Sequence, residues 1–488
     1  MNGAEYIESM NDGREVWYDG ERVPHVAEHP VLGRCVENRA REYDLHSAPE
    51  HHDLLSSETE AGDPCCIMYH IPTSSDDLVR YRSVLELAIG KSGSAVGDHS
   101  HFSQEGAMGS LLRLRSLLKG SLRAITPPQY AQNVEAYYQR CRAEDLTNTG
   151  AFSEVKEEPG VPTWKQPRYM RVVDETDRGI VVNGIRRIST CVAYSHEINT
   201  LTQANVFYAD GLSDADAAGD YRGLFFMFAV PVGTPGIKVI CRPSQVASHR
   251  ERFDFPISWY DEVDGMIVFD HVLVPWERVF CYGDRQFLRV VGPSSGLGDY
   301  SRCISLISRM ELLVGAAHTT ARLDGQLGNS SVASQLADLV IALEATKALL
   351  RMAEMQPDQG EGGMVLPSRT LLQIALTHGI KLYYDMLLTV RDLAGASVTT
   401  HQTYRDLVSP EIGRFVQDCF GGEAAAPERL ALLNLVQDLT ASHFAARQDQ
   451  FARFSAGTPA SKKLALAQGY DFQPLVAKIQ QLIADVSA

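Results

Sequence analysis

The chain has no apolar run approaching the roughly 20 residues that a transmembrane helix needs. Its first residues, MNGAEYIESMNDGREVWYDG, lack the basic start and apolar stretch of a secretory signal. Positive charge is scarce as well, because 45 Lys and Arg face 61 Asp and Glu, a formal net charge of −16. Binding to nucleic acid or to an anionic membrane surface needs basic patches, so neither is expected. We expect a cytoplasmic protein.

Paired cysteines and nucleotide motifs are also lacking. The nine cysteines are scattered without a CxxC motif, and the adjacent Cys65 and Cys66 are poorly placed to bridge each other. Free thiols in a reduced compartment are therefore expected. No Gly-x-Gly-x-x-Gly follows a predicted strand, so no nicotinamide-dinucleotide fingerprint is present. No metal site is expected, because no third ligand has a recognisable spacing.

The pattern of apolar residues divides the chain into three parts. The 488 residues, 44% of them hydrophobic, suffice for two to four packed units. In residues 1–145, after a hairpin-like "YDGERVP", segments such as "DDLVRYRSVLELAIGKSG" and "PPQYAQNVEAYYQRCRAEDL" have helical spacing. Residues 146–290 alternate and are rich in β-branched residues, as in "RYMRVVDETDRGIVVNGIRRISTCVAY". Because few helical segments separate these strands, an antiparallel barrel or sandwich is favoured over a parallel sheet.

Residues 291–488 are predicted to be helical again. Apolar residues recur at i, i+3, i+4 and i+7 in segments 301–327, 331–355, 368–395 and 427–457. Four such helices in series predict a four-helix bundle with a tail, one that also mediates oligomerisation. The predicted fold class is α+β, with an N-terminal helical domain, a central β domain and a C-terminal bundle.

This order of parts resembles the acyl-CoA-dehydrogenase-like flavoprotein fold. The segments "YMRVVDETDRGIVVNGIRRIST", "FAVPVGTPGIKVICR", "DEVDGMIVFDHVLVPWERVF", "RDLAGA" and "ARFSAGTP" resemble the 4-hydroxyphenylacetate 3-hydroxylase family in order and spacing. The resemblance covers about residues 15–465. Its strongest signal is "FDHVLVPWERVF", which we expect to be a strand and turn that seat the bundle rather than a catalytic element.

The resemblance implies the oxygenase half of a two-component monooxygenase. Such proteins receive reduced flavin, FADH2 or else FMNH2, from a separate NAD(P)H:flavin reductase. They react it with dioxygen and hydroxylate an aromatic substrate through a flavin C4a-hydroperoxide. A homotetramer, built as a dimer of dimers, is implied as well. The missing nicotinamide fingerprint is compatible, because the flavin already arrives reduced.

The resemblance assigns five residues to the flavin. The family's flavin-contacting threonine falls on Thr190 in "RRISTCVAY", where the alternative is an ordinary threonine in a strand. Arg447 and Gln448 in "SHFAARQDQFARF" are expected to reach a flavin phosphate or ring from a neighbouring subunit, or else to lie on an exposed helix face. Thr149 is assigned to the flavin, and Lys156 stands in the flavin loop where the family carries a Pro-Gln pair.

The substrate residues depart from the family. An Arg and, four residues later, a Tyr hold the substrate in its phenol hydroxylases; here Asp98 and Phe102 stand in "VGDHSHFSQ". Gly150 stands where the family has a His that contacts the phenol oxygen. The inverted charge at Asp98 disfavours an anionic tail and suits a cationic amine or an N–H donor. Leu201 and Thr202 are also assigned to the substrate.

Two histidines lie beside Asp98. His99 or His101 is expected to supply the proton-accepting role that Gly150 cannot, because imidazole titrates near working pH. Asp98, His99 and His101 are therefore the candidate catalytic residues. The alternative is that one or both histidines cap a helix and face water.

The leading hypothesis is a reduced-flavin-dependent monooxygenase for a neutral or cationic aromatic or heteroaromatic substrate in specialised metabolism. One alternative is a flavin-binding relative that has lost or altered its activity, such as a scaffold. The other is a lyase like 4-hydroxybutyryl-CoA dehydratase, which needs an iron–sulfur cluster on cysteines and a histidine. Residues 94–104 contain no cysteine, and Cys281 lacks a histidine at the expected spacing.

Overall fold

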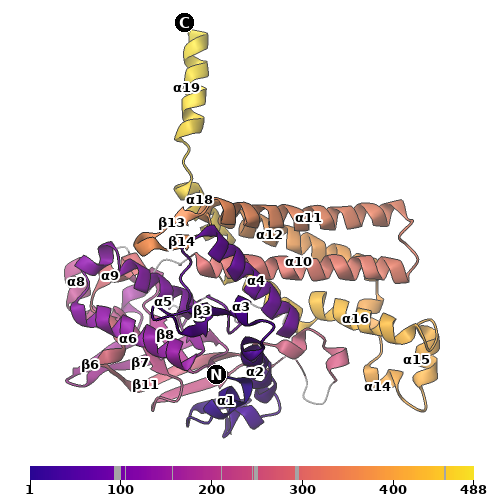
Figure 1. Cartoon of the computed structure of the whole chain (residues 1–488), viewed down its shortest axis with the longest axis horizontal. Helices are drawn as coiled ribbons and strands as arrows, with labels where there is room; N and C mark the ends of the chain where they lie inside the picture. The colour runs from indigo at the N-terminus through magenta and orange to yellow at the C-terminus, as the bar shows by residue number, and fades with distance from the viewer. Residues whose placement is uncertain are drawn as a thin grey trace.

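The computed structural model describes residues 1–92, 100–104, 106–156, 158–209, 211–244, 246, 251–291, 296–455 and 458–487. Helices from the N-terminal part and two sheets lie against one side of a long helical bundle, and the last helix stands away from the bundle (Figure 1). No helix in these ranges combines the length and the apolar character needed to cross a membrane. The nine cysteines are all free thiols, as expected.

The N-terminal part is mainly helical, as predicted. Pro128 occupies the first turn of its last long helix, α6, where a missing N–H costs nothing. The helix ends at Asp145, which adopts a left-handed conformation with φ 51°. The long helices are α2 (Leu32–Ser47), α4 (Ser75–Ser92), α5 (Gly106–Leu117) and α6 (Pro128–Glu144), after the short α1 (Gly3–Ser9).

The expected hairpin at "YDGERVP" is present, and it belongs to the β part of the molecule. Strands β1 (Glu15–Tyr18) and β2 (Glu21–Val23) pair with each other, and β1 pairs with β10 (Ile237–Cys241). The first 145 residues therefore contribute two strands to a sheet. The three domain boundaries drawn from the sequence stay predictions.

Two sheets face each other across an apolar core. The strand orders are β2-β1-β10-β11-β7-β6 and β12-β9-β8-β5. The antiparallel prediction is right except for two parallel pairs, β1 with β10 and β5 with β8, which long stretches of chain connect. The remaining strands are β5 (Asn148–Gly150), β6 (Arg171–Thr176), β7 (Gly179–Thr190), β8 (Glu197–Leu201), β9 (Phe226–Pro231), β11 (Asp264–Pro275) and β12 (Val279–Tyr282).

The "FDHVLVPWERVF" block is a strand and turn, but it does not seat the bundle. After β11, a turn at Trp276–Arg278 leads into β12. The Asn133 side-chain amide on α6 donates to the carbonyl oxygens of Trp276, at 2.7 Å, and Val279, at 2.8 Å. The block therefore holds the β part against an N-terminal helix.

The C-terminal bundle contains the predicted helices, with one break. Segment 427–457 forms two helices, because the Ser442 hydroxyl accepts a hydrogen bond from the Ala445 N–H and so starts a new helix. The bundle helices are α10 (Leu297–Leu323), α11 (Ser330–Met355), α12 (Arg369–Ala394) and α16 (Ala426–Thr440), followed by α17 (His443–Phe454), α18 (Pro459–Gly469) and α19 (Gln473–Ser487).

The remaining elements are short. They are α3 (His52–Leu55), α7 (Ala204–Phe207), α8 (Asp214–Ala218), α9 (Arg285–Val291), α13 (Ser397–Thr400), α14 (Tyr404–Leu407), α15 (Gly413–Cys419), β3 (Ser56–Glu58), β4 (Pro64–Cys66), β13 (Asp358–Gln359) and β14 (Val365–Leu366). One apolar core joins the N-terminal helices to the bundle, and a second fills the space between the sheets.

Candidate functional site

A cavity of about 640 Å³ lies where the N-terminal helices, the β part and α17 meet. Its walls come from residues 100–103 and 106–108, from β5 and the segment after it, from the end of β7, and from α17. This volume lies within the range of small-molecule sites in proteins. Five of the residues predicted from the sequence line it: His101, Thr149, Gly150, Thr190 and Arg447.

Other predicted residues lie outside the lining. The Phe102 ring is fully buried and packs against the rings of His46 and His101. Thr202 is buried, and its hydroxyl donates to the Leu224 carbonyl oxygen at 2.7 Å and accepts from the Phe226 N–H. Leu201 and Gln448 are buried away from the cavity, Lys156 is exposed, and Asp98 and His99 lie outside the described residues.

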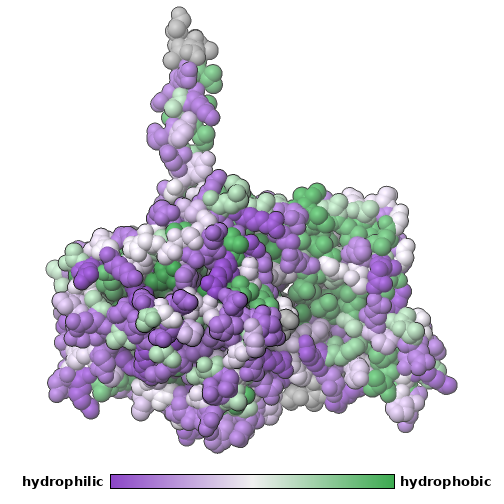
Figure 2. All heavy atoms as spheres, in the orientation of Figure 1, coloured by the Kyte–Doolittle hydropathy of each residue, from purple (hydrophilic) through white to green (hydrophobic). Residues whose placement is uncertain are grey.

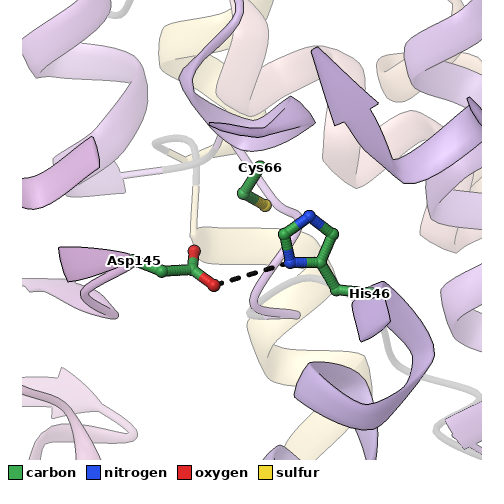
Figure 3. Close-up of side chains that lie close together, drawn as sticks. All are labelled: His46, Cys66 and Asp145. Atoms are coloured by element: carbon green, nitrogen blue, oxygen red, sulfur yellow. Dashed lines mark ion pairs between the residues drawn. The ribbon is translucent and has the colours of Figure 1, made fainter. Parts of the chain in front are cut away.

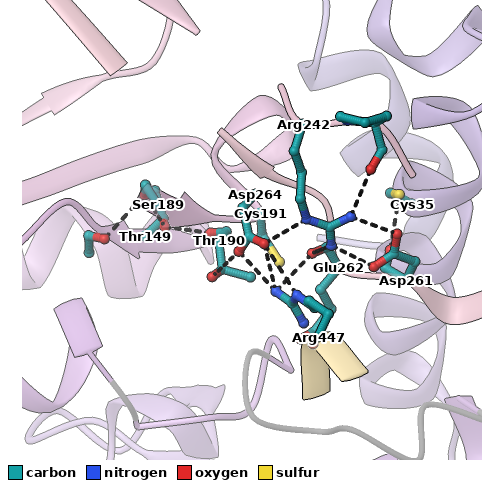
Figure 4. A network of polar contacts seen from close by, with 12 residues as sticks. Cys35, Thr149, Ser189, Thr190, Cys191, Arg242, Asp261, Glu262, Asp264 and Arg447 are labelled. Carbon is teal, nitrogen blue, oxygen red and sulfur yellow. Dashed lines mark hydrogen bonds and ion pairs between the residues drawn. The ribbon is translucent and has the colours of Figure 1, made fainter. Parts of the chain in front are cut away.

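A polar network surrounds Thr190 at the end of β7 (Figure 4). The Thr190 hydroxyl donates to Asp264 Oδ1 at 2.6 Å, and Thr149 Oγ1 donates to the Thr190 carbonyl oxygen at 2.7 Å. Arg447 Nη2 lies 2.9 Å from both Asp264 oxygens, and Arg242 Nε lies 2.7 Å from Oδ2. Because the Thr190 hydroxyl donates its hydrogen to Asp264, its oxygen can act only as an acceptor toward a group in the cavity.

Asp264 is the centre of this network, and the sequence reasoning missed it. Burial raises the pKa of this carboxyl, but the Arg447 and Arg242 guanidiniums outweigh burial and hold the pKa below its usual range. The signal that could have pointed to it is the acidic run "DEVDG", which leads into the first residues of β11. Arg447, expected to act from a neighbouring subunit, here pairs with Asp264 of its own chain and lines the cavity.

Gly150 leaves room that a neighbouring ring fills. A Cβ atom at this position would lie 2.5 Å from Cε2 of Phe152, closer than real Cβ atoms approach. Both residues line the cavity, and the Phe152 ring is half-buried there. The glycine therefore allows Phe152 to form part of the cavity wall.

Gly150→Ala is expected to push the Phe152 ring aside and so to change the shape of the cavity. One methyl group in a binding pocket is worth about 1–3 kcal/mol, so KM for the aromatic substrate should rise about tenfold or more. Steady-state kinetics check this. The matched control is Gly315→Ala in α10, where an added Cβ meets no atom within 4 Å, and its KM should stay unchanged.

Behind the cavity wall, His101 belongs to a buried cluster. His101 Nε2 lies 3.1 Å from Asp145 Oδ1 and 3.8 Å from Cys66 Sγ. On the other side, His46 Nδ1 lies 3.5 Å from Asp145 Oδ2 (Figure 3). Burial raises the pKa of Asp145, but the two histidines outweigh it and lower that pKa below its usual range. Spacing could not reveal this cluster, because its members come from separate segments.

The cluster includes atoms that could hold a metal. One ligand atom each from His46, Cys66 and Asp145 lies within 4.8 Å of the others, the one such group among the described residues. A structural zinc site needs four ligands. The ion pairs of Asp145 with the histidines already account for this arrangement.

Family comparisons cover almost the whole chain. Residues 2–281 match a family described as 4-hydroxyphenylacetate 3-hydroxylase N terminal, and residues 295–484 match its C-terminal counterpart. The chain is 28% identical to the 4-hydroxyphenylacetate 3-monooxygenase oxygenase component of Thermus thermophilus, over 99% of this chain and 97% of that protein.

Two further proteins extend the comparison. A Streptomyces globisporus monooxygenase of a (3S)-3-amino-3-(3-chloro-4-hydroxyphenyl)propanoyl group on a peptidyl-carrier protein is 27% identical, over 96% of this chain and 86% of that protein. A crystal structure of a 4-hydroxyphenylacetate 3-monooxygenase oxygenase component, complexed with FAD and 4-hydroxyphenylacetate, has a TM-score of 0.87 and 27% identity. It covers 100% of this chain and 99% of that one. The likeness therefore extends to the whole fold.

Proposed function

The chain belongs to the 4-hydroxyphenylacetate 3-hydroxylase family, and from this premise we propose that it is the oxygenase component of a two-component aromatic monooxygenase. The observation that carries the proposal is a single cavity lined both by Thr190, whose hydroxyl is anchored by Asp264, and by His101, whose imidazole is buried behind the wall. The first suits a flavin ring and the second a substrate hydroxyl. Its partners are a separate NAD(P)H:flavin reductase and dioxygen.

FAD, taken up as FADH2, is the proposed cofactor, with FMNH2 as the alternative. Reduced flavin supplies the activation of dioxygen. Thr190 would accept a hydrogen bond from the ring, Thr149 fixes the backbone of Thr190, and Arg447 would provide a positive charge at the cavity wall. Apolar side chains of Phe451 and Phe454 also line the cavity, which suits a large planar ring and limits water.

An anaerobic titration with FADH2, followed by a pulse of oxygen, tests the function. We expect saturable binding, weaker in Thr190→Ala, and flavin oxidation coupled to hydroxylation of an added phenol. Flavin that binds but yields only hydrogen peroxide with every aromatic tested would favour a relative with lost activity. An iron–sulfur lyase is disfavoured, because the one group of potential metal ligands among the described residues contains a single cysteine.

The proposed substrate is a neutral or cationic aromatic, consistent with a role in specialised metabolism. Asp98 carries a negative charge where the family's phenol hydroxylases carry an arginine. A carboxylate repels an anionic tail and attracts an ammonium or an N–H donor. The Streptomyces relative, whose named substrate contains an amino group, sets a precedent within the family.

Asp98→Asn should lower kcat/KM for a cationic phenol such as tyramine about ten- to a hundredfold. The reason is the loss of a charge-assisted contact worth roughly 1.5–3 kcal/mol. Parallel kinetics with 4-hydroxyphenylacetate are the control, because the substitution should leave that anion unaffected or improve it. Efficient turnover of 4-hydroxyphenylacetate by the native protein, unchanged in the variant, would contradict the assignment.

We also propose a homotetramer in which α19 packs on another subunit. Helix α19 stands clear of its own chain in Figure 1, and apolar side chains run along it in Figure 2. An isolated helix of about 15 residues is marginal in water, so it needs a packing partner. The exposed apolar residues of α19 are Leu475, Val476, Ile479, Leu482 and Ile483, spaced along one helical face.

Ile479→Glu is expected to convert much of the tetramer to smaller species, because it buries a charge in that contact. Light scattering coupled to size-exclusion chromatography measures the mass. The matched control is Gln481→Glu, two residues along the same helix, which adds the same charge on the opposite, polar side and should leave the mass unchanged. Equal masses for both variants would exclude α19 from the interface.

A further inference from the structure

The ring of His101 is held from several sides. Nε2 lies 3.1 Å from Asp145 Oδ1, and the ring stacks on Tyr43 with centroids 4.1 Å apart. Its backbone N–H donates to Glu42 Oε2 at 2.8 Å. The residue lines the cavity, and its side chain is 0% exposed to solvent. The imidazole therefore offers one orientation to a molecule in the cavity.

The two ring nitrogens of His101 have different surroundings. A carboxylate can only accept, so the contact with Asp145 places the proton of the neutral ring on Nε2. Nδ1 is buried and has no hydrogen-bond partner among the described residues. A buried acceptor left without a partner costs free energy. Nδ1 is thus the ring nitrogen that is left to accept a hydrogen bond.

Asp145 lies directly after the end of α6, where the backbone holds it in place for the contact with His101. It follows the last residue of the helix in a left-handed conformation, and the Tyr43 hydroxyl donates to its carbonyl oxygen at 2.8 Å. The lowered pKa described above means that the carboxylate is charged in neutral solution. A charged carboxylate behind an imidazole both fixes its tautomer and stabilises the imidazolium.

Other ionisable groups face this pair. His46 and the chain's amino terminus lie 3.5 and 3.6 Å from Asp145 Oδ2 and share its charge. Arg39 neutralises Glu42 through a 2.6 Å contact. Burial raises the pKa of the Cys66 thiol, so it stays neutral. Arg14 and His196 lie farther away, and burial together with Arg14 lowers the pKa of His196 to about 3.

We propose that Asp145 is the positioning residue that makes His101 the proton acceptor for a hydroxyl group of the substrate. The inference rests on the proposed function, because that hydroxyl belongs to the aromatic substrate. The O–H bond breaks, its electron pair stays on oxygen, and a new N–H bond forms at Nδ1. The proton on Nε2 stays there and donates to Asp145. No atom changes oxidation state, and the aromatic ring of the substrate becomes more electron-rich.

4-Nitrophenol is the probe, because its ionised form absorbs visible light and reports proton transfer without turnover. Bound to the native protein, it should ionise at lower pH than in solution. Asp145→Asn should raise the ionisation midpoint of the bound phenol by about one to two pH units, because the charge-assisted contact between Asp145 and His101 is lost. His101→Gln should remove the shift. Cys66→Ser, which alters the cluster without removing an acceptor for Nε2, is the matched control and should keep it.

Equal midpoints in the native protein and Asp145→Asn would overturn the proposal. If 4-nitrophenol does not bind, ¹⁵N spectra of the histidines in the ligand-free protein decide, with His101→Gln for assignment. The native ring must then carry its proton on Nε2, and Asp145→Asn must change that tautomer ratio. A stoichiometric transition metal lost in Asp145→Asn would also overturn it. None of these measurements needs flavin, so they fail or succeed independently of the oxygen pulse.

Discussion

Asp264→Asn is expected to lower the free energy of unfolding by about 3 kcal/mol and to weaken FADH2 binding at least tenfold. Removing one partner of a buried ion pair typically costs roughly 3–5 kcal/mol, because the other charge stays buried. Arg242 keeps two contacts with Asp261, and the Asp264 side chain is 16% exposed, which places the expected loss at the lower end. Arg447 keeps, among the described residues, a hydrogen bond to the Glu262 carbonyl oxygen and its contact with the Phe451 ring. Thr190 loses the acceptor that orients its hydroxyl. Urea unfolding and an anaerobic flavin titration measure the two effects.

The matched control lies on the same strand. Asp270 of β11 pairs with Lys238 at 2.9 Å on the surface, where an ion pair contributes little. Asp270→Asn should therefore change neither unfolding nor flavin binding measurably. A similar loss of stability in both variants would mean that the Asp264 network contributes no more than a surface pair.

The contribution of Asp264 to the free energy of unfolding should depend on pH in a definite direction. The folded-state pKa of Asp264 lies below its unfolded value of about 4. Such a group stabilises the protein above pH 4 and loses that contribution as the pH falls toward the folded pKa. The stability difference between the native protein and Asp264→Asn should stay constant from pH 5 to pH 8, roughly, and shrink below about pH 4.

Local patterns predicted much of the fold. The period of apolar residues identified the helices of α10, α11 and α12, and Pro128 marked the start of α6. The parallel pairings of β1 with β10 and of β5 with β8 were not predicted, because the partner strands follow far along the chain and no local pattern indicates such a pairing. The break at Ser442 was visible in principle, since a serine three residues before an apolar helix face is a cap signal.

The site was less accessible to sequence reasoning. The structure brings Thr190, Gly150 and His101 to one cavity. Sequence reasoning had pointed to all three, to Thr190 and Gly150 through the resemblance and to His101, with His99 as the alternative, through imidazole chemistry. It could not point to Asp145 or to His46, because their meeting with His101 depends on how α2 and α6 pack. Phe152 was only two residues from Gly150, yet its role depends on the direction of its ring. Pairing and side-chain direction are properties of the packed structure.

One more buried pair holds the wall beside Phe152. The guanidinium of Arg186 is 0% exposed and pairs through Nη1 with Glu154. Its Nε donates to Thr200 Oγ1 at 3.0 Å, and Nη2 donates to the Leu201 carbonyl oxygen at 2.9 Å. Burial raises the pKa of Glu154 and lowers the pKa of Arg186. The attraction between the two charges acts in the opposite direction on each pKa, but it is the smaller effect. The pair thus ties the segment after β5 to β7 and β8 at a cost in desolvation.

Arg186→Met should lower the free energy of unfolding by about 3–5 kcal/mol at neutral pH, because Glu154 is left buried without its counter-charge. The pKa of Glu154 then rises further above its unfolded value of about 4.3. The folded variant therefore keeps Glu154 protonated over a range in which the unfolded chain loses that proton, and its stability falls as the pH rises through this range. The defect should therefore be smaller at pH 5 than at pH 7, roughly, in urea unfolding. The double variant Arg186→Met with Glu154→Leu should regain most of the stability and lose this pH dependence, since it buries no charge. Equal losses in the single and double variants would mean that the hydrogen bonds of Arg186 to β8, and not its charge, hold the cavity wall.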